Sequence, residues 1–442
     1  MPKVVVLGAG MVTRPLVRYL LNQRDMKVVV ATRTVEKAEK MIAGHPNGEA
    51  KALDVEKNLA AVEEEVKGAD VVVSLVPYAY HVSVAKFGIK HKKHVVTTSY
   101  VSDAMKALDG DAKKAGVILL NECGLDPGID HMSAMRIIHD VKKRKGNVVS
   151  FKSSTGALPA HEANKNPFGY KFSWSPRGVL LASRNSAKWL EDGREVNVPG
   201  EQLFENYYIQ DVPEIGSFEN YPNRNSVPYK DVYGLDHART VYRGTFRMTG
   251  WCETMRRVVA LGWLGDQPVA GFSGKTYGDV TRHLIGAAPG ADLPRAAAKF
   301  LRVDPYATVI KRYEWLGLFG DEPLPADKDT PLDYLNVLTL KKMVIGEDEK
   351  DMIVMHHEFV AEFSGGKKEY LTSTLVDYGI PGEDTSVART VSLPAAIAVK
   401  LILDRKIKDT GCHIPVAPTI YNPILDELES YNVIFKERKH EL

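Results

Sequence analysis

The first 120 residues predict an α/β fold in which helices cover both faces of a parallel sheet. Short, continuous apolar runs such as residues 4–7 and 28–31 alternate with segments of helical apolar spacing. Continuous apolar strands are typical of a sheet that is buried on both faces, and the helices between them supply the crossovers that parallel pairing requires. Because such crossovers are right-handed, the pattern predicts a doubly wound, Rossmann-like sheet.

The individual elements follow in regular order, and the pattern changes after about Asp130. In the first part we predict strands at residues 4–7, 28–31, 71–76, 94–98 and 117–120, with helices at 11–21 and 35–42. In the second part we predict strands at residues 148–154, 241–248, 350–359 and 369–376, and helical segments at 179–189, 254–341 and 393–403. Strands of mixed polarity indicate an α+β domain with a mixed or antiparallel sheet, and the last helix is expected to return to the first domain.

The composition excludes several classes of function. The 442 residues carry 58 Lys and Arg against 56 Asp and Glu, and the resulting charge of +2 indicates no nucleic-acid partner and no anionic membrane surface. No apolar run approaches the roughly 20 residues that a membrane span needs. The first strand begins too near the N-terminus to leave room for a signal or transit peptide. We therefore expect a cytoplasmic protein.

The cysteines and histidines show no metal-binding pattern. Cys123, Cys252 and Cys412 are widely separated, which indicates reduced thiols in a reducing compartment. His356-His357 and Cys412-His413 have no further ligand at metal spacing. We therefore expect no metal site.

Gly8 and Gly10 lie between the first predicted strand and the first predicted helix. Gly8 permits a tight turn there, and Gly10 allows the backbone to approach a pyrophosphate at the helix N-terminus. The third glycine of the usual pattern is replaced by Thr13, so a plain strand-to-helix turn is the alternative. In this strand–loop–helix context we predict a dinucleotide-binding loop.

The end of the second predicted strand indicates which dinucleotide binds. Enzymes that use NAD usually place an acid there for the ribose hydroxyls. This chain has Thr32-Arg33-Thr34 instead, with no acid before Glu36. An arginine between two hydroxyls suits a 2′-phosphate, so we predict NADP, the alternative being that Arg33 is only a solvated charge. Asp54 and Val55, after a third extended stretch, are expected to border the adenine.

An acidic, turn-forming run follows the apolar residues 116–120. It reads Asn-Glu-Cys-Gly-Leu-Asp-Pro-Gly-Ile-Asp-His over residues 121–131. In open α/β sheets the ends of the strands are where substrate meets bound nucleotide. Asp126 is therefore a candidate catalytic residue, although an acid before Pro127 could also cap a helix that begins there.

The run over residues 124–130 closely resembles the GLDPGID signature of saccharopine reductases, the NADP-dependent, glutamate-forming saccharopine dehydrogenases. The resemblance continues along nearly the whole chain in ordered blocks, at residues 74–78, 95–100, 166–175, 221–224, 243–247 and 374–379. Two stretches depart from the family. Residues 155–159 read Thr-Gly-Ala-Leu-Pro where the family often has Cys-Gly-Gly-Leu-Pro, and residues 384–388 read Asp-Thr-Ser-Val-Ala where relatives often have Gly-Tyr-Ser-Ala-Met.

The resemblance implies a division of the chain into three parts. An NADP-binding Rossmann domain spans residues 1–130, to which residues of about 390–442 return. An α+β domain for substrate binding and dimerisation comprises residues 131–250 and 342–389, and a helical insertion comprises residues 251–341. A homodimer is therefore expected.

The resemblance also implies which residues line the two ligands. Together with the glycine loop, the residues expected to line the cofactor are Gly8, Ala9, Gly10, Met11, Val12, Thr32, Arg33, Thr34, Asp54, Val55, Val76, Thr98, Ser99, Leu125, Asp126, Pro127 and Ser175. The residues expected to line saccharopine are Ser99, Tyr100, Asp126, Arg224, Thr245, Phe246 and Arg247.

The chemistry of saccharopine gives these residues their expected roles. Saccharopine is a secondary amine with three carboxylates, and Arg224 and Arg247 are suited to clamp carboxylates, unless they form structural ion pairs. Asp126 is expected to hold the substrate ammonium or to take a proton during imine hydrolysis. Tyr100 is the second candidate catalytic residue and is expected to donate a hydrogen bond to substrate, its alternative role being packing.

We therefore expect an oxidoreductase that interconverts L-saccharopine with L-glutamate and 2-aminoadipate 6-semialdehyde in lysine metabolism. It is expected to stand alone, without a fused lysine–ketoglutarate reductase, since the chain begins at the nucleotide strand. One rival is a carboxynorspermidine dehydrogenase, whose substrate has fewer carboxylates and would not need both arginines. The other rival is a non-catalytic NADP-binding regulator, which tight NADPH binding without turnover would favour.

Overall fold

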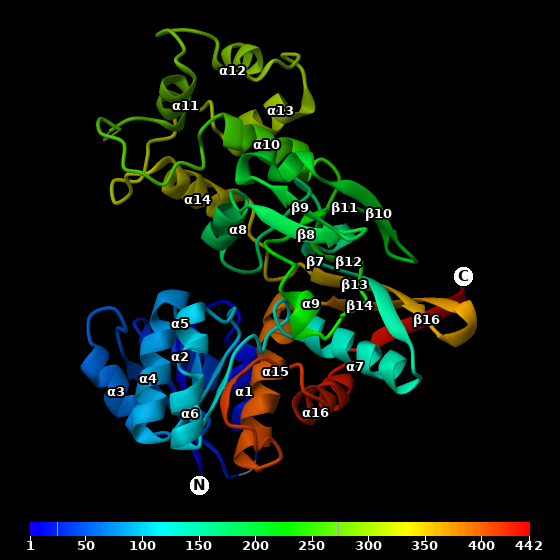
Figure 1. Ribbon diagram of the computed structural model, residues 1–442. Helices are drawn as coiled ribbons and strands as arrows, with labels where there is room; N and C mark the ends of the chain where they lie inside the picture. Colours follow the sequence, from blue (N-terminus) through cyan, green and yellow to red (C-terminus); the bar gives the residue numbers. More distant parts are fainter. Residues whose placement is uncertain (24, 273) are drawn as a thin grey trace. The chain divides into compact units, whose positions relative to one another are not determined.

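Two units, each with its own β-sheet, make up the chain, shown in Figure 1 as a computed structural model. The structure describes residues 1–23, 25–272 and 274–442. The first unit comprises residues 1–147, 363–366 and 373–438, and the second unit comprises residues 148–362, 367–372 and 439–442.

A seven-stranded sheet forms the centre of the first unit. Its strands are β1 (Lys3–Leu7), β2 (Lys27–Thr32), β3 (Gly48–Ala52), β4 (Val71–Ser74), β5 (His94–Thr97), β6 (Ile118–Leu120) and β15 (Gly411–His413). They lie in the order β15-β6-β5-β4-β1-β2-β3, and every neighbouring pair is parallel. The predicted doubly wound parallel sheet is therefore confirmed, with β15 as a strand that the sequence pattern did not predict.

Helices pack on both faces of this sheet. The helices of the first unit are α1 (Arg14–Leu21), α2 (Val35–Ile42), α3 (Leu59–Lys67), the 3₁₀ turn η1 (Tyr78–Tyr80), α4 (His81–His91), α5 (Asp103–Lys106), α6 (Asp109–Ala115), α7 (Ile129–Lys143), α15 (Ser386–Leu403) and α16 (Pro418–Glu429). Alternate strand residues such as Val5, Val29 and Val72 form one apolar cluster with Val62 of α3 and Val84 of α4. This alternation explains why the strands are apolar throughout, since each face needs its own set of buried side chains.

The C-terminal helices belong to the first unit, as the sequence predicts. Helix α15 packs against α1, β4 and β5, and the blue α1 and orange α15 lie side by side in Figure 1. The helix begins at Ser386 rather than at the predicted Leu393, because the hydroxyl of Thr385 caps it by accepting a hydrogen bond from the Ala388 N–H at 3.0 Å.

Helix α15 is also the one helix in the described part of the chain that is long and apolar enough to cross a membrane. It has 18 residues, and 78% of them are buried inside the unit. A helix that is covered to this extent is typical of the core of a folded unit.

The second sheet has nine strands and mixed pairing. They are β7 (Asn147–Pro159), β8 (Ala187–Glu191), β9 (Arg194–Val198), β10 (Tyr208–Val212), β11 (Gly216–Pro222), β12 (Thr240–Arg247), β13 (Asp351–Glu362), β14 (Lys368–Tyr378) and β16 (Phe435–Glu441). The order is β10-β11-β12-β7-β13-β14-β16, and β8 pairs with β12 and β9. Strands β12 and β7 are parallel, whereas β10, β11 and β12 are antiparallel. The predicted mixed sheet is therefore confirmed.

A helical segment follows β12 in the second unit. Besides the short elements η2 (His161–Ala163), α8 (Pro176–Ala182), η3 (Gly200–Glu205) and α9 (Tyr229–Val232), this unit contains α10 (Trp251–Ala260), α11 (Tyr277–Ile285), α12 (Leu293–Leu301), α13 (Thr308–Leu316) and α14 (Pro331–Lys342). The short turn η4 (Ser364–Gly366) joins β13 to β14. Helices α10 to α14 share one apolar cluster that contains Trp251, Trp263, Tyr277 and Tyr313, in agreement with the helical pattern over residues 254–341.

The predicted helix over residues 179–189 is confirmed over residues 179–182 and wrong beyond them. Helix α8 ends at Ala182, and residues 187–191 form β8, which pairs with β9 in an antiparallel hairpin. Asp192 and Gly193 have φ of 48° and 82°, the left-handed conformation that a two-residue hairpin turn requires. The Trp189 ring packs at 88° to the Tyr242 ring, 5.8 Å away, so sheet packing overrides the helical spacing.

Candidate functional site

The predicted cofactor residues of the first unit follow five neighbouring strands at one edge of the sheet. Gly8 to Val12 follow β1, Thr32 ends β2 and Arg33 and Thr34 follow it, Asp54 and Val55 follow β3, Val76 follows β4, and Thr98 to Tyr100 follow β5. Because all these strands are parallel, their carboxyl ends share one edge. This edge is where open α/β sheets bind nucleotides.

The loop after β1 has the shape that a dinucleotide site needs. Gly8 has a φ of 107°, and a Cβ there would lie only 2.8 Å from the Leu75 carbonyl oxygen, so no other residue fits without strain. Gly10 is exposed, and a Cβ there would meet no atom within 4 Å, which leaves space for a phosphate group. Thr13 takes the place of the third glycine, and its Oγ1 accepts a hydrogen bond from the Gly10 N–H at 3.1 Å. The loop therefore fits the pyrophosphate of a dinucleotide.

Arg33, after β2, is exposed, whereas Asp54, after β3, is half-buried and the neighbouring Val55 is buried. The Arg33 side chain is 65% exposed, and its Nη1 is 3.9 Å from a carboxylate oxygen of Glu56. Asp54 turns its Oδ1 toward its own chain and accepts hydrogen bonds from the N–H groups of Glu56 and Lys57 at 2.9 and 3.3 Å. A long, exposed pair of this kind is weak, so Arg33 can exchange it for a phosphate.

The loop after β6 lies against the loop after β5. The N–H groups of Glu122 and Cys123 donate to the carbonyl oxygens of Ser99 and Thr97, both at 3.1 Å. The Tyr100 hydroxyl donates to Asp126 Oδ1 at 3.0 Å. The two residues predicted to be catalytic are therefore in direct contact.

Asp126 does not cap the following helix, so that alternative from the sequence is wrong. Helix α7 begins at Ile129 with Gly128 as its N-cap, and the Gly128 N–H donates to Asp130 Oδ1 at 2.6 Å. The preceding Asp126–Pro127 peptide bond is cis. Asp130 thus supplies the acceptor at the start of α7, and the Asp126 carboxylate accepts a hydrogen bond from the Tyr100 hydroxyl.

A buried polar cluster supports this loop. Glu122 is 3% exposed and His131 is fully buried, and the carboxylate of Glu122 lies 2.7 Å from His131 Nε2. The other oxygen of Glu122 accepts a hydrogen bond from the Val101 N–H at 2.9 Å. Because Val101 follows Tyr100, this cluster fastens the chain next to the Tyr100–Asp126 contact.

His81 is a supporting residue that the sequence reasoning missed. It begins α4, and its ring nitrogens lie 2.8 Å from the hydroxyl oxygens of Ser74, at the end of β4, and Ser99, after β5. In a neutral imidazole one nitrogen donates and the other accepts, so neutral His81 joins the two hydroxyls through one donated and one accepted hydrogen bond. His81 therefore fixes the rotamer of Ser99, one of the predicted ligand-lining residues.

Acidification is expected to destabilise the first unit through His81. Burial lowers the pKa of His81 from 6.5 to about 4. Between these two values the unfolded chain binds more protons than the folded chain, so the stabilisation is complete above about pH 6.5 and is lost as the pH falls toward 4. We expect wild type to lose about 2 kcal/mol of unfolding free energy between pH 7 and pH 5, and His81→Gln to lose less.

Urea denaturation at both pH values measures this loss. The matched control is His237→Gln, which changes an exposed histidine of the second unit and should keep the pH dependence of wild type. An equal pH dependence in wild type and His81→Gln would contradict the role of His81.

Arg247 has an unusual environment at the end of β12 in the second unit. It is 6% exposed, and its guanidinium carbon lies 4.9 Å from the Tyr170 ring centroid, 5.5 Å from that of Trp251 and 5.9 Å from that of Tyr221. Its Nη1 donates to the carbonyl oxygen of the neighbouring Phe246 at 2.8 Å. Its buried Nε has no hydrogen-bond partner among the residues that the structure describes.

Arg247 is therefore a cation held by aromatic rings instead of by an acid. Aromatic faces attract a guanidinium but cannot accept hydrogen bonds as a carboxylate does. The Tyr170 hydroxyl and Trp251 Nε1 are also buried without a partner in the described part of the chain. A buried donor without a partner costs free energy, so this group of donors favours an anion that brings the missing acceptors.

The other predicted residues of the second unit lie in different environments. Thr245 lies beside Tyr221 of β11 and beside Thr155 of β7, whose buried hydroxyl has no partner within the described ranges. Phe246 points to the opposite face, into a cluster with Phe218, so only its backbone contacts Arg247. The direction of the Phe246 side chain therefore does not support its predicted role in lining the ligand.

Arg224 and Ser175 are exposed loop residues. Arg224 follows β11 with a φ of 53°, and its carbonyl oxygen accepts a hydrogen bond from the Lys188 N–H at 2.8 Å. Ser175 caps α8, and its Oγ accepts a hydrogen bond from the Gly178 N–H at 3.2 Å. Both side chains are accessible to a ligand.

No group of three or more metal-ligating side chains occurs among the described residues. All three cysteines are free thiols, Cys123 and Cys252 buried and Cys412 half-buried. Burial raises the pKa of each thiol, which makes them poor nucleophiles.

Two family models match the chain and cover nearly all of it. The saccharopine dehydrogenase NADP binding domain matches residues 4–120, and the saccharopine dehydrogenase C-terminal domain matches residues 124–434. The chain belongs to the saccharopine dehydrogenase family. The predicted family, the oxidoreductase class and the NADP cofactor are therefore confirmed.

Individual relatives agree over the full length. The chain is similar to saccharopine dehydrogenase (NADP+, L-glutamate-forming) of Schizosaccharomyces pombe, with 40% identity over 99% of both chains. The solved structure of apo saccharopine dehydrogenase (L-Glu forming) from Saccharomyces cerevisiae has a TM-score of 0.90 and 38% identity and covers 100% of both chains. A homospermidine synthase from Legionella pneumophila has a TM-score of 0.60 over 99% of this chain and 91% of that chain, and at 10% identity it shows a shared fold alone.

Proposed function

We propose that the chain catalyses the NADP-dependent interconversion of L-saccharopine with L-glutamate and 2-aminoadipate 6-semialdehyde, a reaction of lysine metabolism. In the oxidative direction a hydride leaves the carbon next to the secondary amine, and water hydrolyses the resulting imine to the two products. NADP, when bound, accepts the hydride. The residues of the chain must therefore bind and orient the substrate and move the protons.

The observation that carries this proposal is the environment of Arg247. A buried guanidinium with an unpartnered Nε and no acidic partner among the described residues suits a substrate carboxylate. Saccharopine has three carboxylates, and Arg224, whose side chain is exposed, is the proposed partner of a second one. A planar guanidinium binds a carboxylate through two parallel hydrogen bonds and so also fixes its orientation.

Asp126 and Tyr100 are the proposed catalytic pair. Their direct hydrogen bond of 3.0 Å orients the carboxylate. Asp126 holds the substrate ammonium and takes a proton during hydrolysis of the imine, and Tyr100 donates to the substrate when its bond to Asp126 is exchanged. Ser99, whose rotamer His81 fixes, completes the substrate-lining side chains on this loop.

The first experiment is a measurement of initial rates of nucleotide reduction with L-saccharopine, with NADP and NAD side by side. Turnover with NADP supports the reaction and the cofactor. Turnover with NAD alone would keep the reaction and contradict the proposed role of Arg33. Failure with both, together with turnover on carboxynorspermidine, would favour the polyamine enzyme, and tight NADPH binding without any turnover would favour a regulator.

The variant Arg33→Ala tests the proposed phosphate contact. We expect the KM for NADP to rise about 10-fold because an ionic hydrogen bond to the 2′-phosphate is lost. The KM for saccharopine should stay the same, and so should any KM for NAD, which has no 2′-phosphate. The matched control is Lys37→Ala, which removes another exposed cation from the same region. An unchanged KM for NADP in Arg33→Ala would overturn the contact.

We also propose an oligomeric state, a cellular compartment and a domain division for the chain. We propose a homodimer formed through the α+β part, residues 131–250 and 342–389, with residues 1–130 and 390–442 for NADP and residues 251–341 as a helical insertion. Three free cysteines support a reducing, cytoplasmic compartment. Light scattering of the purified protein measures its mass in solution. The mass of a single chain would contradict the proposed homodimer.

A further inference from the structure

Glu219 lies directly opposite Arg247 in the antiparallel pairing of β11 and β12. Opposite residues in such a pair point to the same face with their Cβ atoms about 5 Å apart, which is within reach of a Glu–Arg ion pair. Both side chains are buried, with 2% and 6% exposure. Nevertheless Arg247 forms no ion pair with Glu219 in the described part of the chain.

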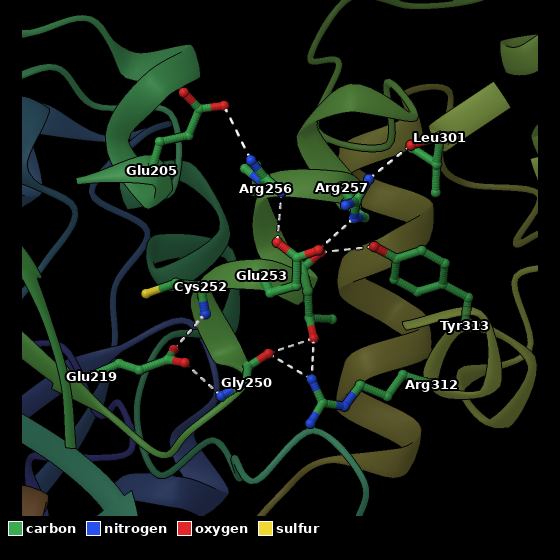
Figure 2. Close-up of polar contacts among 11 residues, drawn as sticks. Glu205, Glu219, Gly250, Cys252, Glu253, Arg256, Arg257, Leu301, Arg312 and Tyr313 are labelled. Carbon is green, nitrogen blue, oxygen red and sulfur yellow. Dashed lines mark hydrogen bonds and ion pairs between the residues drawn. The ribbon is translucent and has the colours of Figure 1, made fainter. Parts of the chain in front are cut away.

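The N-terminus of α10 binds the Glu219 carboxylate instead (Figure 2). Its Oε1 accepts a hydrogen bond from the Gly250 N–H at 2.6 Å, and its Oε2 accepts one from the Cys252 N–H at 2.8 Å. Gly250 is the N-cap of α10 and has no side chain to cap it. Glu219 therefore takes the place of the cap, at the helix end where an anion is most favourable.

Arg312 holds this helix end in place (Figure 2). Its Nη1 donates to the Gly250 carbonyl oxygen at 2.5 Å and also to the Thr254 hydroxyl, which in turn donates to the same carbonyl oxygen at 2.6 Å. A Cβ on Gly250 would lie 2.6 Å from Arg312 Nη2, so the guanidinium fills the space beside the turn. Burial lowers the pKa of Arg312, and the negative charge of Glu219 opposes this shift.

We propose that the N-terminus of α10 and Arg312 keep the Glu219 carboxylate away from Arg247, so that Arg247 stays available for a carboxylate of the substrate. A buried carboxylate that lost these partners would turn to the nearest buried cation, because an unpaired buried charge is costly. For Glu219 that cation is Arg247, the opposite residue on the next strand. Glu219 and Arg312 are thus positioning residues, and the inference rests on the function proposed above for Arg247.

Four full-length variants test this inference: Arg312→Met, Glu219→Gln, their combination, and the control Arg257→Met. Arg257 lies on α10, the helix whose N-terminus binds Glu219, but it pairs with Glu253 and the Leu301 carbonyl oxygen, away from Glu219 (Figure 2). For each protein we would measure kcat, the KM for L-saccharopine, the KM for NADP and the melting temperature. Arg312→Gln, which removes the charge but keeps a polar side chain, replaces Arg312→Met if the latter fails to fold.

The expected pattern depends on the charge of Glu219. Arg312→Met should raise the KM for saccharopine about 10-fold, because releasing Glu219 gives Arg247 an internal competitor. The KM for NADP should stay within about 2-fold of wild type. Glu219→Gln keeps one acceptor oxygen for the helix N–H groups but has no charge and cannot form an ion pair. The double variant should therefore regain most of the lost affinity.

Other patterns would overturn the inference. A double variant as impaired as Arg312→Met, or more so, would show that the charge of Glu219 does not compete. An unchanged KM for saccharopine in Arg312→Met would show that Arg312 does not hold Glu219 away. Equal rises in both KM values, or the same losses in Arg257→Met, would indicate general damage to the helical segment.

A crystal structure of substrate-free Arg312→Met separates failure of the inference from failure of the proposed function. This structure can be determined whether or not the variant is an active enzyme. In it we expect a Glu219 carboxylate oxygen within about 3 Å of an Arg247 nitrogen. If that pair forms although wild type does not turn over saccharopine, the proposed function fails while the positioning role of Arg312 stands. If Glu219 stays on α10, the inference fails regardless of the substrate.

Discussion

Replacing Arg247 by alanine is expected to raise the KM for L-saccharopine by about 100- to 1,000-fold. Loss of one partner from a buried, hydrogen-bonded charge pair costs about 3 to 4 kcal/mol, because the remaining charge is left without its partner. In this protein the remaining charge would be a substrate carboxylate among Tyr170, Tyr221 and Trp251. Initial-rate kinetics with saccharopine varied at saturating NADP measure the effect.

The change to alanine also removes volume from the aromatic group, so a second variant is needed. Arg247→Met keeps an unbranched side chain of similar length and loses only the charge and the donors. The two variants should show similar rises in the KM for saccharopine and little change in the KM for NADP. Equal rises in both KM values would instead indicate a disturbed fold, and an unchanged KM for saccharopine would refute the carboxylate site.

The parallel sheet of the first unit follows from local pattern, because strands buried on both faces must be apolar at every position. Residues 4–7, 28–31 and 71–74 are all buried and all apolar apart from Ser74. β15 has no such signal, since Gly411, Cys412 and His413 are neither long nor apolar enough. Its place beside β6 depends on the return of the C-terminal segment, which no local pattern encodes.

The hairpin of β8 and β9 shows a different limit. Apolar residues at positions 187, 189 and 190 fit helical spacing as well as a strand, so the signal that distinguishes them is the Asp192-Gly193 turn. The Asp192-Gly193 dipeptide marks this turn in the sequence, whereas the apolar spacing alone favours a helix. Short apolar segments are decided by such turns, because both periodicities fit them.

Within the candidate site, the sequence predicted single residues better than their partners. The contact of Tyr100 with Asp126 joins two residues that were both predicted as catalytic. His81 was missed because its partners, Ser74 and Ser99, lie in different loops and form no sequence motif. Likewise Arg247 was predicted, but its aromatic surroundings come from segments that only tertiary folding brings together.

Replacing Asp126 by asparagine is expected to lower kcat by about 100-fold or more. Asparagine has nearly the same shape and still accepts the hydrogen bond from Tyr100, but it cannot take a proton and has no charge to hold an ammonium group. Proton transfer by a positioned side chain contributes about 100- to 10,000-fold to rate. Steady-state kinetics over a range of pH values measure the loss, with NADPH binding followed separately.

Tyr100→Phe shows whether the carboxylate itself or its orientation matters. This variant keeps Asp126 charged and removes only the hydroxyl that binds it, so kcat should fall less than in Asp126→Asn. Because α7 is capped by Gly128 and Asp130, neither variant removes a helix cap, and both should melt near the wild-type temperature. Wild-type kinetics in Asp126→Asn would leave the carboxylate without a catalytic role, and proton transfer would then have to come from another group or from water.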